Sequence, residues 1–85
     1  MIVQVRELRG LPLWLLKIYL CDIGGHEKHG DRVEGPGWCA HLAQMEDFQV
    51  GAVRVGQVRL RLEIDDDILE EFTAALDKKL LRAGG

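Results

Sequence analysis

Hydrophobic and polar residues alternate without a break from Gln57 to Ile64, near the end of this 85-residue chain. A period of two is typical of a strand with one face in water and the other on a core. Three aspartates follow the strand, and Asp67 with Glu70 has the spacing of a capping box. Apolar residues three and four positions apart then predict a helix over residues 68–83. These two elements predict a half-exposed sheet whose dry face is covered by a helix.

The first part of the chain predicts another strand and a nearly apolar helix. Residues 1–8 alternate, and Gly10 ends that strand. Pro12 suits the first position of a helix over residues 11–22, which a Gly-Gly pair would end. Nearly every residue of this helix is apolar, which is more than a helix with one exposed face needs. We therefore expect one of its faces to meet the sheet and the other to meet a second chain.

A homodimer is the expected assembly, with a separate protein partner as the alternative. A domain of 85 residues has little core to spare, and oligomerisation often completes such domains. The candidate interface residues on the first helix are Leu13, Trp14, Lys17 and Leu20.

Between the two helices the chain alternates polar, glycine-rich stretches with short strands. The strands are predicted at residues 32–34, 38–44, 48–55 and 57–64, with a tight turn at Gly56 before the last one. The order is therefore β-α-β-β-β-β-α over a single domain, residues 1–85. We expect a two-layer α+β fold in which a curved antiparallel sheet packs against two helices.

The amino-acid composition of the chain argues against several classes of function. A net charge of −3 argues against general nucleic-acid binding. The longest apolar run contains Lys17 and is about half a membrane span, and no signal peptide is visible, so a cytoplasmic protein with reduced cysteines is expected. The sequence has no Ser, which excludes a serine nucleophile. It also has no Asn and many charged residues, as in heat-adapted proteins. We predict a non-enzymatic protein without a cofactor.

Histidine and cysteine residues are concentrated in one segment. All three histidines and both cysteines lie between residues 21 and 41. Imidazole and thiolate are the ligands that zinc prefers, so His26, His29 and His41 are candidate metal ligands. Their spacing matches no standard zinc motif, and a solvated loop with incidental histidines is the simpler interpretation.

Arginines on the last strands suggest a second kind of site. Arg54, Arg59 and Arg61, with Gln57, are expected to share the exposed face of these strands. Guanidinium groups bind phosphates and carboxylates, so this face would suit an anionic ligand. The alternative is a solubilising surface, because exposed charges on strands are common.

Several short motifs resemble a known family. They are Tyr19-Leu20, Ile23-Gly24-Gly25, Gly35-Pro36-Gly37-Trp38, residues 53–60 and the ending from Leu80 to Gly85. Together they resemble a small domain of unknown function from thermophilic bacteria, which also forms the C-terminal domain of MoaD-related proteins behind a ubiquitin-like sulfur carrier. The resemblance implies a fold similar to TATA-binding-protein-like (TBP-like) domains, in the order β-α-β4-α. It also implies an alternative function, an accessory role in molybdopterin or sulfur-carrier metabolism.

The last two residues, Gly84 and Gly85, invite comparison with sulfur carriers, which are activated at a Gly-Gly carboxylate. Here the pair follows a predicted helix instead of the strand that precedes it in ubiquitin-like proteins. A helix stop with a frayed end is the simpler interpretation.

Overall fold

The computed structural model describes residues 1–82. Its elements are β1 (Ile2–Arg9), α1 (Leu13–Asp22), β2 (His26–Lys28), β3 (Arg32–Gly35), β4 (Trp38–Gln44), β5 (Phe48–Val50), β6 (Val53–Val55), β7 (Gln57–Ile64), a 3₁₀ turn η1 (Asp66–Ile68) and α2 (Leu69–Arg82). The predicted α+β class with two helices is confirmed. No helix among residues 1–82 is long and apolar enough to cross a membrane.

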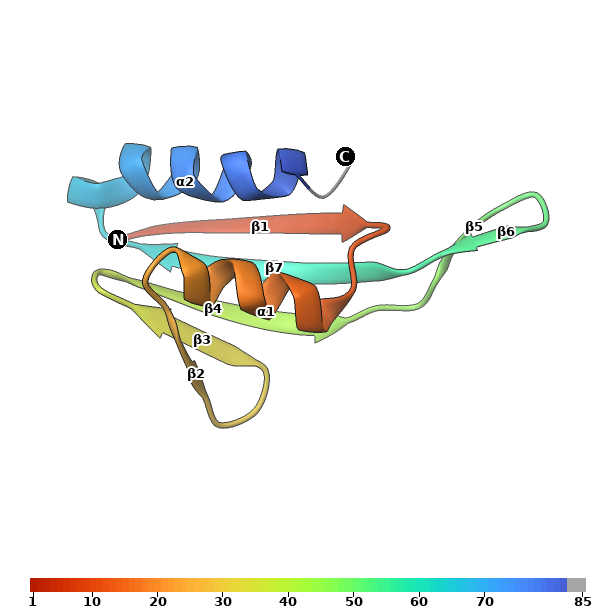
Figure 1. The fold of residues 1–85 in the computed structure, drawn as a ribbon, viewed down its shortest axis with the longest axis horizontal. Helices are drawn as coiled ribbons and strands as arrows, with labels where there is room; N and C mark the ends of the chain where they lie inside the picture. The colour runs from red at the N-terminus through yellow and green to blue at the C-terminus, as the bar shows by residue number, and fades with distance from the viewer. Residues whose placement is uncertain (83–85) are drawn as a thin grey trace.

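Five of the strands form one antiparallel sheet in the order β1-β7-β4-β3-β2. Strand β7 lies between β1 and β4, and it pairs with β1 along eight residues and with β4 along seven. Strands β5 and β6 form a separate hairpin that projects beyond the sheet (Figure 1). Strand β1 is thus a long edge of the main sheet, and β2 is a short one.

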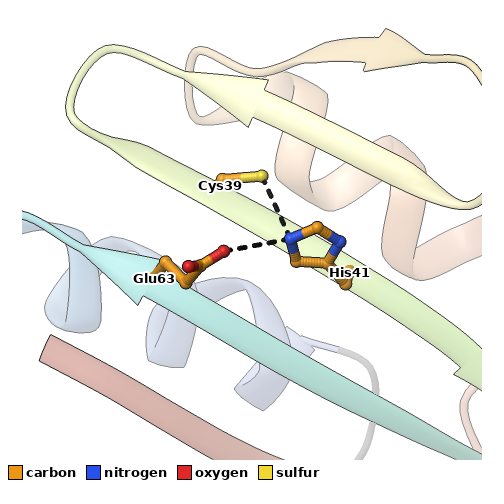
Figure 2. A group of neighbouring side chains, drawn as sticks. All are labelled: Cys39, His41 and Glu63. Atoms are coloured by element: carbon orange, nitrogen blue, oxygen red, sulfur yellow. Dashed lines mark hydrogen bonds and ion pairs between the residues drawn. The ribbon is translucent and has the colours of Figure 1, made fainter.

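The core lies on one face of this sheet. The apolar residues of the alternating pattern in β7, such as Leu60 and Leu62, are fully buried. Each helix contributes buried leucines to the same core, Leu20 from α1 and Leu76 from α2. Burying a side chain of this size stabilises the fold by roughly 1.5–3 kcal/mol. The helices lie behind the sheet when it is viewed from its other face (Figure 2).

Trp38 on β4 fixes how closely the core packs at one end. Its ring lies 4.8 Å from that of Phe72 in α2. Gly35, which pairs with Trp38 across β3 and β4, lies directly against the indole, so a Cβ at this position would overlap the ring. Glycine is therefore required here by close approach.

The segment from 48 to 55 corrects the predicted strand order. It forms a hairpin instead of one strand, because Gly51 turns the chain with a φ of 58°. Gly56 makes no tight turn between paired strands; its carbonyl accepts a hydrogen bond from the Gly10 amide at 2.8 Å. The Arg9 guanidinium lies 3.7 Å from the centre of the Phe48 ring and ties the hairpin to the end of β1. With the additional short strand β2, the described residues contain seven strands instead of five.

The two helices begin later than predicted. Pro12 lies at the N-cap, and α1 starts at Leu13. The prediction of a capping box at Asp67 is wrong, because that residue lies inside the 3₁₀ turn. The turn is closed by a backbone hydrogen bond from the Ile68 amide to the Asp65 carbonyl at 3.1 Å, and α2 follows at Leu69.

Candidate functional site

The face of the main sheet that points away from the helices is here called the open face. Its side chains alternate with the buried ones along each strand. On the three longest strands, β1, β7 and β4, they are Val3, Val5, Glu7, Arg59, Arg61, Glu63, Cys39, His41 and Ala43. Neither helix covers this face, so a ligand or partner could contact the sheet here.

Three side chains of different chemistry meet on the open face. Cys39 and His41 are two residues apart on β4, which puts them on one side of the sheet, and Glu63 is the register partner of Cys39 on β7. The Cys39 Sγ lies 3.5 Å from His41 Nε2, and the same nitrogen lies 3.1 Å from Glu63 Oε2 (Figure 2). All three side chains are partly buried. The cluster therefore joins a thiol, an imidazole and a carboxylate around one point.

This arrangement is unlike a cysteine–histidine–acid relay. In such a relay one ring nitrogen faces the nucleophile and the other faces the acid. Here Nε2 faces both Cys39 and Glu63. Burial raises the pKa of the Cys39 thiol above its usual 9.0, and the nearby carboxylates of Glu34 and Glu63 raise it further, against the opposing effect of Arg32 and Arg61. A protonated thiol is a poor nucleophile, so the geometry does not favour covalent catalysis.

The three histidines predicted as metal ligands are not brought together. His26 lies on β2 opposite Glu34, and His29 lies in the exposed turn that follows. Within residues 1–82 only His41 belongs to a group of three ligand-type side chains, with its donor atom within 4.8 Å of those of Cys39 and Glu63. Sequence periodicity had already placed Cys39 and His41 on one side of a strand. The missing partner, Glu63, depends on the pairing of β4 with β7.

The predicted arginine face is only partly formed. Arg59 and Arg61 lie on the open face, but Arg54 lies on β6 in the projecting hairpin, opposite Gln49. The expectation that all three share one surface is therefore wrong for Arg54. Gln57 is in phase with the arginines but only 8% exposed.

The two remaining arginines are ion-paired. The Arg59 guanidinium donates to Glu7 at 3.3 Å, and that of Arg61 lies 3.8 Å from Glu63. An anion would have to compete with these carboxylates.

Only some of the residues predicted as an interface on the first helix lie at the surface. Leu20 is fully buried in the core, so it is not a surface residue and that part of the prediction is wrong. Leu13, Trp14 and Lys17 line a shallow groove along α1, and Trp14 is 62% exposed.

The Lys17 ammonium bridges Glu27 at 3.2 Å and Asp31 at 2.9 Å. Hydrogen bonds to Asp31 and then to Glu27 raise the pKa of Lys17.

An exposed apolar stretch on β1 was not singled out by the sequence. Ile2, Val3 and Val5 are 37%, 52% and 57% exposed although they belong to a regular strand. The valines point to the open face, and the strand itself lies at the edge of the sheet. The alternating pattern showed the strand but could not show that no further strand follows it.

Comparison with known proteins places the chain in a family. Residues 4–85 match a family model described as archaeal MoaD-like protein. A search of curated proteins found no match. The Gly84–Gly85 ending falls within the matched range but outside the described residues. Since the match covers nearly the whole sequence, the chain belongs to the archaeal MoaD-like protein family.

Proposed function

We propose that this protein is a non-enzymatic interaction module that works as a homodimer joined along strand β1. The observation that carries the proposal is the edge of the main sheet. An eight-residue strand is paired on one side only among the described residues, and it exposes Ile2, Val3 and Val5.

Long unpaired edges that carry apolar side chains are aggregation-prone, and natural proteins usually shorten, charge or cover them. The opposite edge of this sheet, β2, has only three residues, all exposed, with the sequence His-Glu-Lys. The two edges therefore differ, and β1 is the one suited to pairing. A second copy of the same strand is the simplest cover, because it continues the antiparallel sheet across a two-fold axis.

One register of such a pair fits the side chains of β1 best. With Gln4 opposite its own copy, each Val3 lies opposite Val5 of the other chain, and four valines meet on the open face. Ile2 then faces Arg6, and no like charges lie directly opposite each other. Shifting the register by four residues in one direction would put Arg6 opposite its own copy, which is unfavourable.

Sedimentation velocity of the wild-type chain and three variants tests this proposal. We expect a wild-type dimer, and a folded monomer for Val5→Glu, because a carboxylate would be buried among valines. Val53→Glu is the matched control: Val53 is also an exposed strand valine, but it lies on the projecting hairpin, so the dimer should persist. Trp14→Glu examines the α1 groove. A monomeric wild type would refute the dimer, and dissociation by Trp14→Glu alone would move the interface to α1.

A second candidate function follows from family membership. We propose as the alternative an accessory role in molybdopterin or sulfur-carrier metabolism, in which Arg59 and Arg61 bind an anionic ligand on the open face. Replacing both arginines with alanine should abolish binding of pyrophosphate, followed by NMR, while the far-ultraviolet circular dichroism stays unchanged. Undiminished pyrophosphate binding by this variant would refute the alternative.

Three finer expectations remain proposals of the same kind. They are a TBP-like topology, a cytoplasmic location and a source adapted to heat. The last would give a midpoint of thermal unfolding above the roughly 45–65 °C that is usual for domains of mesophiles.

A further inference from the structure

We propose that Cys39, His41 and Glu63 form a binding site for a transition-metal ion, most suitably zinc, on the open face of the sheet. This inference goes beyond the proposed dimer and does not depend on it, because all three residues belong to one chain. It replaces the predicted set of three histidines with a set that the strand register brings together.

The first reason is that the sulfur and the carboxylate both face one ring nitrogen, which cannot offer a separate proton or lone pair to each of them. His41 Nε2 has either one proton or one lone pair, yet it faces both the Cys39 Sγ at 3.5 Å and the Glu63 Oε2 at 3.1 Å. If Nε2 is protonated, one N–H is shared between the sulfur and the carboxylate. If it is not, its lone pair faces the Glu63 carboxylate. A cation between the three atoms would accept a lone pair from each of them.

The second reason is the spacing of the donor atoms. Zinc binds sulfur at about 2.3 Å and imidazole nitrogen at about 2.0–2.1 Å, so tetrahedral ligands are about 3.5 Å apart for sulfur and nitrogen and about 3.3 Å for nitrogen and oxygen. The two observed distances, 3.5 Å and 3.1 Å, are close to these values. The third pair, Cys39 Sγ and a carboxylate oxygen of Glu63, lies within 4.8 Å, and rotation of the partly exposed Glu63 side chain would shorten it.

The chemistry of the ligands selects the metal. Thiolate and imidazole favour zinc and similar ions over magnesium or calcium, which prefer oxygen. A thiolate and a carboxylate would together balance the two positive charges of the ion. The Arg61 guanidinium, two residues before Glu63 on β7, lies 3.8 Å from Glu63 Oε2 and would help to orient the carboxylate.

The site would be open on one side. Three protein ligands leave the fourth position of a tetrahedral ion to water or to an added ligand. The side chains of His41 and Glu63 are 39% and 30% exposed, so solvent reaches the cluster from the uncovered side of the sheet. A small anionic or thiol-containing ligand would be able to bind the metal there.

Cobalt(II) binding to the untagged chain tests the proposal, because a thiolate ligand gives a charge-transfer band that imidazole and carboxylate ligands do not. We expect one Co²⁺ per chain, this band in the wild type, and displacement of Co²⁺ by Zn²⁺. Cys39→Ser should abolish the band, whereas Cys21→Ser, which changes the other cysteine, should keep it. His41→Gln and Glu63→Gln should weaken the affinity by at least the roughly 10–100-fold that follows loss of an outer-shell partner.

Two controls make every outcome decisive. His29→Gln removes an exposed histidine outside the cluster and should leave the affinity unchanged. Circular dichroism checks that each variant is folded, and if Cys39→Ser does not fold, the affinities of His41→Gln and Glu63→Gln decide. A wild type without the band, or equal metal affinity in all the folded variants, would overturn the proposal.

Discussion

The two faces of the main sheet differ sharply although they are built by the same strands. On β7, Leu62 points to the helices and is fully buried, while Arg61 and Glu63 on either side of it point to the open face. The centre of the covered face is apolar and closely packed around Trp38 and the leucines of both helices. The open face combines valines, arginines and the Cys39–His41–Glu63 cluster. This contrast indicates that one face stabilises the fold and leaves the other available for binding.

The largest effect expected from this contrast is at Leu62. Leu62→Ala should lower the free energy of unfolding by about 2–5 kcal/mol, because it leaves a cavity in the core. Arg61→Ala, one residue earlier on the same strand, should change it by no more than about 0.5 kcal/mol. Urea denaturation of both variants measures the difference. Equal losses would show that the open face also supports the fold.

A smaller effect is expected at Gly35, where the covered face is most crowded. Gly35→Ala should cost about 1–3 kcal/mol, since the new methyl group overlaps the Trp38 indole. Gly56→Ala is the matched control, because a Cβ at Gly56 meets no atom within 4 Å and its φ is not positive. Thermal unfolding should separate the two variants. A neutral Gly35→Ala would mean that Trp38 is free to move.

At Cys39, on the open face, we expect an effect on the reactivity of the thiol more than on the stability of the fold. Because burial and then Glu34 raise the pKa of its thiol, alkylation of metal-free protein by iodoacetamide near neutral pH should be slower at Cys39 than for an ordinary free thiol. Glu34→Gln should accelerate it by removing one negative charge. Mass spectrometry of peptides that contain Cys39 gives the rates. Faster modification than that of a model thiol would contradict the raised pKa.

The smallest effect is a pH dependence at Lys17. Asp31 and Glu27 raise its pKa above the usual 10.5, so the ion pairs stabilise the folded state below this pH and are lost as the pH rises through the raised value. The midpoint of thermal unfolding of the wild type should exceed that of Lys17→Met at about pH 8, and the difference should disappear above the raised pKa. A difference that does not change with pH would show that Lys17 contributes only through its aliphatic part.

The sequence predicted those features that depend on short-range periodicity. Alternation located β1, β4 and β7 and put Cys39 and His41 on one side of a strand. Long-range pairing could not be derived in this way, so the contact of Cys39 with Glu63 was missed. The glycine at position 51 interrupts a run of strand-forming residues, and only the folded hairpin shows that Arg54 is thereby removed from the open face.

Helix α1 shows a different limit of prediction from the sequence. Since its residues are apolar nearly all round, periodicity does not define which face is buried. Leu20 and Trp14 were therefore both plausible surface residues, whereas the structure buries the first and leaves the second 62% exposed. Its outer face remains the main competitor of β1 as an interface.

The most direct test of the division between the two faces is an NMR titration of the ¹⁵N-labelled wild-type chain, first by dilution and then with zinc. We expect dilution to shift the amides of residues 2–7 and zinc to shift those around Cys39, His41 and Glu63, with the outer residues of α1 unaffected by either. Shifts concentrated around Trp14 and Ile18, with the open face unchanged, would contradict the proposal that the uncovered side of the sheet is the binding surface.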